Sequence, residues 1–99
     1  MTWIRTIPLS QGDERLRRAV ESQRALYPPE YAEPVTAAAA DEAAGNDMAG
    51  IVASHSLIPE ALYHAFSTFG VLMSPDLPLT RRQQEMITTM VSVTNRCHY

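Results

Sequence analysis

An all-α fold is expected for this chain of 99 residues, on the strength of three observations. Apolar residues recur at spacings of three and four in several segments, which is the period of an amphipathic helix. Residues that favour the start of a helix, Asp13, Pro59 and Thr80, stand before these segments. No stretch shows the alternation of apolar and polar residues that is typical of a strand. Residues 1–99 are therefore expected to form one small helical domain, or part of one.

The first helix is expected over residues 13–27. Asp13 is a suitable N-cap, and Leu16, Val20 and Tyr27 would lie on one side of the helix. Four arginines would mostly line the opposite side: Arg15, Arg17, Arg18 and Arg24. They are expected to form a solvated face rather than an anion site. The two prolines that follow would end the helix.

The segment 28–48 is expected to be a loop-rich connector with one short helix at most. It contains three prolines and the run Gly-Asn-Asp at 45–47, and both features are typical of turns. Its alanine run over residues 37–40 can be helical but contributes little to a core. Residues 1–12 are expected to be an extended arm.

Two helices are expected in the middle of the chain, a short one over residues 48–55 and a stronger one over residues 57–73. Pro59 stands in the first turn of the second helix, where proline is tolerated. Apolar residues at spacings of four, three and four then form a stripe that would face the core: Leu62, Phe66, Phe69 and Met73.

The last helix is expected over residues 80–94. Thr80 is a good N-cap, and Gln83 follows three residues later, at the spacing of a capping box. The helix carries a stripe at helical spacing, which Val93 widens: Met86, Ile87, Met90, Val91 and Thr94. Met86 and Met90 are expected to belong to the core. Part of the stripe is expected to be uncovered without a further helix after it, and an uncovered apolar surface would favour association.

Glu85 and Cys97 are the chemically suggestive residues of this last segment. On one straight helix they would lie roughly 18 Å apart and about a third of a turn out of phase. They could meet only if the helix breaks at Asn95 and a new element begins near Cys97. A thiolate at the start of a helix would be stabilised by backbone N–H groups and by the positive end of the helix dipole.

Composition argues against several classes of function. The net charge is −3, and the eight basic residues, all arginine, form no basic face for nucleic acid. No run approaches the roughly 20 apolar residues of a membrane span, and no secretory signal is visible, so a cytoplasmic location is expected. The single cysteine excludes an internal disulfide framework. No metal site or cofactor is expected, because His55 and His64 are nine residues apart and no dense carboxylate cluster accompanies them.

The segment from Glu85 through eleven residues to Cys97, followed by His98 and Tyr99, resembles the alkylhydroperoxidase-like family, also called the carboxymuconolactone decarboxylase superfamily. The motif of that family is Glu, eleven residues, Cys-x-x-Cys, three residues, His. Upstream, the stretch SHSLIPEALYHAF at 54–66 resembles the Pro-Glu-Ala-Leu helix of the family, and the opening WIRTIP resembles peroxidase-related members. The second cysteine and the motif histidine would lie beyond Tyr99.

The resemblance implies an all-α antioxidant protein that reduces small hydroperoxides by thiol chemistry, as a homo-oligomer. Cys97 would be the resolving cysteine of a Cys-x-x-Cys pair, Glu85 would pass protons to and from the thiol site, and His98 would assist. The reductant would be a thioredoxin-like or lipoyl partner. The helix that carries the rest of the motif is missing from these residues. The 99-residue chain alone is therefore expected to be inactive, because one cysteine cannot form the intramolecular disulfide of the cycle.

Each of these residues has a simpler interpretation as well. Cys97 could be a small buried hydrophobic residue, and Glu85 a solvated carboxylate paired with Arg81 or Arg82. His98 follows Cys97 directly, and adjacent residues of a helix point to different sides. For the whole chain, the alternatives are a non-catalytic helical oligomerisation module and an enzyme of the carboxymuconolactone decarboxylase type, which needs no paired thiols.

The resemblance stops one residue before the expected second cysteine. One hypothesis is that a UGA codon follows and encodes selenocysteine, so that a selenol would attack the peroxide. A deliberate truncation or a frameshift is an equal alternative. The codon after Tyr99 decides between them.

Overall fold

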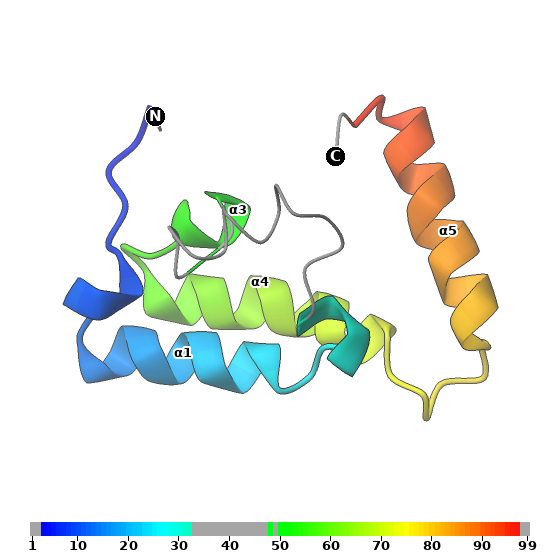
Figure 1. The fold of residues 1–99 in the computed structure, drawn as a ribbon, viewed down its shortest axis with the longest axis horizontal. Coiled ribbons are helices and arrows are strands. Elements are labelled where there is room, and N and C mark those ends of the chain that lie inside the picture. Colours follow the sequence, from blue (N-terminus) through cyan, green and yellow to red (C-terminus); the bar gives the residue numbers. More distant parts are fainter. Residues whose placement is uncertain (1–2, 33–47, 49, 98–99) are drawn as a thin grey trace.

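The computed structural model of this chain is helical (Figure 1) and describes residues 3–32, 48 and 50–97. Within these residues the elements follow in the order η1 (Leu9–Gln11), α1 (Glu14–Arg24), η2 (Pro29–Ala32), α3 (Gly50–Ala53), α4 (Pro59–Leu72) and α5 (Arg81–Thr94). The described part of the chain contains no strand, so the expectation of a small all-α fold is confirmed. The alanine run and the Gly-Asn-Asp turn expected in the connector lie outside the described residues.

Helix α1 begins as expected and ends earlier. The Asp13 carboxylate accepts a hydrogen bond of 2.9 Å from the backbone N–H of Leu16, which is the bond of an N-cap. The last helical residue is Arg24 rather than residue 27. The backbone N–H of Tyr27 bonds to the carbonyl of Arg24, only three residues back, so the chain has already tightened into a turn. Tyr27 precedes a proline, and that position disfavours helical backbone angles.

The other helices lie close to their expected positions. Helix α4 has Pro59 in its first turn and spans nearly all of the expected range 57–73. Helix α3 is a single turn, shorter than the expected 48–55, and turns lead from it into α4. Helix α5 starts with a complete capping box, because Thr80 and Gln83 each accept a hydrogen bond from the other's backbone N–H.

The core lies mainly between α1 and α4, which run side by side and in the same direction (Figure 1). Leu16 and Val20 of α1 and Leu62 of α4 are fully buried, and Met48 joins them. Ile7 is partly buried against this cluster, and its backbone N–H donates to the hydroxyl of the buried Ser56. None of the described helices is both long enough and apolar enough to cross a membrane.

Gly70 allows the C-terminal ends of α1 and α4 to come close. It is buried, and a Cβ atom built on it would lie 2.5 Å from the Cβ of Leu26 and 3.2 Å from the ring of Tyr27. The first of these distances is shorter than the closest approach of two non-bonded carbon atoms. A side chain at this position would therefore push the segment after α1 away from α4.

We expect Gly70→Ala to reduce the free energy of unfolding by about 1–3 kcal/mol, as overpacked sites do. Gly50→Ala is the matched control, because nothing lies within 4 Å of a Cβ atom at Gly50. That control should be neutral or slightly stabilising, since alanine favours a helix over glycine. Urea denaturation of both variants checks the prediction, and equal stabilities for the two would contradict it.

Candidate functional site

The C-terminal end of α5 turns sharply and brings Cys97 back beside the last helical turn. Asn95 is the C-cap, and Arg96 follows with a φ of 53°, in the left-handed region. The backbone N–H of Cys97 donates to the carbonyl of Ser92 (2.9 Å), and the N–H of Arg96 donates to that of Val93 (3.0 Å). These two bonds define a Schellman motif. The helix therefore ends at Thr94, as expected, and the break at Asn95 meets one of the two conditions under which Glu85 and Cys97 could approach each other.

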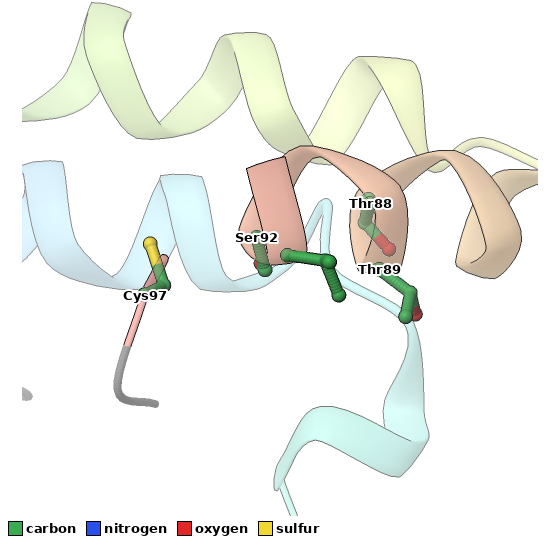
Figure 2. A pocket seen from close by; sticks show the side chains of 5 residues that line it. Thr88, Thr89, Ser92 and Cys97 are labelled. Atoms are coloured by element: carbon green, nitrogen blue, oxygen red, sulfur yellow. The ribbon is translucent and has the colours of Figure 1, made fainter. Parts of the chain in front are cut away.

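The thiol of Cys97 is exposed, so Cys97 is not the buried hydrophobic residue that its simpler interpretation proposed. It borders an open depression of about 370 Å³ on the surface of α5 (Figure 2). The other residues that line this depression are Thr88, Thr89, Ser92 and Val93. His98 and any element that begins after Cys97 lie outside the described residues.

Glu85 is partly exposed and is held by two donors. Arg81, one turn earlier on α5, forms an ion pair of 2.8 Å with the Oε1 atom of Glu85. The hydroxyl of Tyr31 donates a hydrogen bond of 3.0 Å to the same oxygen. The sequence offered Arg81 and Arg82 as partners of Glu85. Among the described contacts, Glu85 pairs with Arg81 and not with Arg82.

Tyr31 and Glu30 belong to η2 and link that short helix to α5. Glu30 pairs with the Nε atom of Arg81 at 3.5 Å, and the guanidinium carbon of Arg81 lies 5.1 Å from the centre of the Tyr31 ring. Sequence reasoning missed both residues. They stand in the proline-rich connector, and Tyr31 is 54 positions from Glu85, so no local spacing could have paired them.

An aromatic cluster fixes the Tyr31 ring. The ring stacks on Phe69 of α4 at a centroid distance of 6.1 Å, and Tyr27 packs edge-on against both, at 6.3 Å from Tyr31 and 5.4 Å from Phe69. Burial raises the pKa of the Tyr27 hydroxyl above its usual value. The pKa of Tyr31 is also raised, mainly by burial and then by its hydrogen bond to Glu85.

Glu85 and Cys97 lie at the two ends of a polar face on α5. Thr88, Thr89 and Ser92 follow Glu85 at intervals of three, four and seven residues, which places them on one side of the helix. Two helical turns separate Glu85 from Ser92, or about 10 Å along the axis. No hydrogen bond joins Glu85 to Cys97 in the described residues. Proton transfer between them would therefore need the intervening hydroxyl groups or water.

The apolar stripe of α5 is exposed, which contradicts the expectation that Met86 and Met90 belong to the core and agrees with the expectation that part of the stripe is uncovered. Its apolar members are between 52% and 64% exposed: Met86, Ile87, Met90, Val91 and Val93. The physical reason is that α1 and α4 form the only extensive helix contact among the described residues, and α5 stands apart from it. Gln84 is the one buried residue of α5, and its side chain donates to the carbonyls of Leu72 and Ser74.

The described residues contain no group of three or more His, Cys, Asp or Glu side chains that could hold a metal ion. His55 makes local contacts instead. Its Nδ1 atom lies 3.0 Å from both the carbonyl of Ile51 and the hydroxyl of Ser54, and its ring packs edge-on against Phe66.

Comparison of the chain with protein-family models, curated proteins and solved structures gave no match. The chemistry open to this site must therefore be argued from its own residues. They offer an exposed thiol, a carboxylate anchored by two donors and a row of hydroxyl groups between them.

The Schellman turn predicts a stabilising substitution next to the thiol. Arg96 has a Cβ atom at a φ of 53°, where only glycine is free of steric strain. We expect Arg96→Gly to stabilise the last turn of α5 by about 1 kcal/mol. Arg96→Ala is the control, because it removes the charge and keeps the Cβ atom, and it should give no such gain. Amide hydrogen exchange at the end of α5 measures both, and equal protection in the two variants would contradict the prediction.

Proposed function

We propose that this chain is an alkylhydroperoxidase-like protein in which Cys97 is a redox-active thiol served by the polar face of α5. One observation supports the proposal above the others. The helix ends at Asn95, and the backbone N–H of Cys97 then donates to the carbonyl of Ser92. The thiol therefore borders the polar face of α5, and Glu85 stands at the other end of that face. This arrangement agrees with the spacing of Glu85 and Cys97, from which the resemblance to that family was drawn.

The proposed role of Cys97 is that of a resolving thiol. A hydroperoxide oxidises a separate attacking thiol, or selenol, to a sulfenic or selenenic acid and leaves as an alcohol. The sulfur of Cys97 then attacks the oxidised atom, forms a disulfide or selenyl sulfide, and releases water. A dithiol reductant, thioredoxin-like or lipoyl, returns the pair to its reduced form by two thiol–disulfide exchanges. Cys97 must lose a proton before it attacks.

Glu85 is the proposed acceptor of that proton. It is the carboxylate at the start of the polar face, and the side chains of Thr88, Thr89 and Ser92 lie along the way to Cys97. The hydroxyl of Thr88 donates to the backbone carbonyl of Glu85 at 3.0 Å, so it would have to leave this bond to donate to the carboxylate. General base catalysis of this kind needs a continuous path of hydrogen bonds from acceptor to donor. The hydroxyl groups, completed by water, would supply that path.

Thiol–disulfide exchange of Cys97 with oxidised glutathione tests this function on the 99-residue chain. We expect the folded chain to react faster than the same chain unfolded in urea, and Glu85→Gln to lower the folded rate by about tenfold or more. Cys97→Ser should abolish the reaction, and Glu60→Gln, which changes a carboxylate on α4 instead, should leave it unchanged. A folded rate no higher than the unfolded rate would refute the function.

A second candidate function, self-association through α5, rests on a different observation. The apolar stripe of this helix is exposed, and burying each such side chain is worth roughly 1.5–3 kcal/mol. The stripe contains no charged residue, so a second copy of the chain could cover it without requiring a partner of opposite charge. Exposed apolar surfaces of this kind favour association.

Sedimentation at micromolar concentration tests the association. We expect an oligomer, and we expect Met90→Glu to shift it toward the monomer by placing a charge within the stripe. Thr89→Glu is the control, because it places the same charge on the polar face and should leave the oligomer intact. A wild-type chain that sediments as a monomer would exclude self-association through α5.

A further inference from the structure

The contacts of Glu85 are unequal between its two carboxylate oxygens. Tyr31 and Arg81 both contact Oε1, at 3.0 Å and 2.8 Å. The contacts that Tyr31 and Arg81 make with Glu85 therefore converge on one of its two oxygens. A carboxylate that is held by one oxygen keeps its orientation while the other oxygen remains free to accept a proton. A general base must also be connected to the proton that it accepts, and the polar face of α5 would have to provide that connection.

Tyr31 is well suited to hold the carboxylate from outside α5. Its ring is fixed by Phe69 of α4 and by Tyr27, so its hydroxyl occupies a defined position. Arg81, by contrast, is on α5 itself and forms ion pairs with both Glu85 and Glu30. The tyrosine therefore links the Glu85 side chain directly to the aromatic cluster on α4, whereas Arg81 links it to η2 through the exposed carboxylate of Glu30.

We propose that Tyr31 is a positioning residue for Glu85, which it holds by Oε1 so that Oε2 can exchange protons along the polar face of α5. This inference rests on the function proposed for Cys97. It adds Tyr31, which lies outside the stretches on which the resemblance to the family rests. Tyr31 remains neutral and donates its proton to the hydrogen bond, and it does not touch the reacting sulfur.

The charged and titratable groups that face Tyr31 come from three elements. They are Glu85 and Arg81 of α5, Glu30 of η2 and Tyr27 from the turn after α1. Glu85 raises the pKa of Tyr31 and Arg81 lowers it, so the two act in opposite directions. Replacing Glu85 by glutamine should therefore lower the pKa of Tyr31 toward the usual value for tyrosine.

The first measurement tests the contact itself. Tyrosinate formation in the full chain is followed by ultraviolet absorbance between about pH 9 and pH 12, the range that surrounds the ordinary tyrosine pKa. The difference between wild type and Tyr31→Phe gives the titration curve of Tyr31. We expect Glu85→Gln to move this curve to lower pH. An unchanged curve would overturn the proposal, whatever the reactivity of Cys97.

The second measurement tests the positioning role through the exchange of Cys97 with oxidised glutathione. We expect Tyr31→Phe to lower the rate severalfold, and we expect the double variant with Glu85→Gln to be no slower than Glu85→Gln alone. Tyr27→Phe is the matched control, because it removes a hydroxyl from the same aromatic cluster and should leave the rate unchanged. Since Tyr31→Phe keeps the stacked ring, its midpoint of urea denaturation should stay close to that of wild type.

The outcomes separate the two proposals. If the wild-type rate is no higher in the folded chain than in urea, the proposed function fails and the positioning role fails with it. If the wild-type rate is raised and Glu85→Gln lowers it while Tyr31→Phe does not, only the positioning role is overturned. Equal losses in Tyr31→Phe and Tyr27→Phe would also overturn it, because they would indicate general damage to the aromatic cluster.

Discussion

The close approach of the turn after α1 to α4 at Gly70 is the constraint on which the rest of the described structure depends. It allows Leu26 and the ring of Tyr27 to lie directly against the backbone of α4. Tyr27 in turn packs against Phe69 and Tyr31, which places η2 beside the end of α4. The polar contacts of η2 then reach α5. A glycine with no role in chemistry thus sets the position of the carboxylate at the candidate site.

Helix α5 is attached to the remainder of the described chain mainly by polar contacts. The two bonds of the buried Gln84 fix the start of the helix to the end of α4 and to the turn that follows. The ion pairs of Arg81 are partly exposed, and such pairs contribute only about 0–1 kcal/mol. Gln84 therefore holds the helix in place, while Tyr31 and Arg81 orient the side chain of Glu85. The apolar stripe of α5 is exposed, so it contributes little to the stability of a single chain. Association with a second copy that buries the stripe would stabilise α5.

The features that the sequence predicted well depend on residues a few positions apart. Asp13 caps α1 through the N–H of Leu16, Thr80 and Gln83 cap each other, and the break at Asn95 follows from the local turn. The end of α1 was predicted too late, because Tyr27 fits the apolar period although the proline after it opposes a helix. The helical period of the stripe that contains Met86 and Met90 was predicted correctly. A period does not show whether another part of the protein covers the apolar side chains, and here they are exposed. The bond between Tyr31 and Glu85 could not have been predicted, since it depends on tertiary contacts: Tyr31 stacks on Phe69 of α4, and Gln84 attaches α5 to the end of α4.

The location of Cys97 determines which physical effect can activate its sulfur. A thiolate gains most at the start of a helix, where free N–H groups and the positive end of the dipole meet it. In the described residues Cys97 instead follows the end of α5, where the last carbonyl groups and the negative end of the dipole oppose a negative charge. Cys97 therefore stands at the C-terminal end of α5 and not at the start of a described helix. In the proposed chemistry, the contribution of α5 would be to accept the proton of Cys97 at Glu85, whose side chain Tyr31 and Arg81 hold.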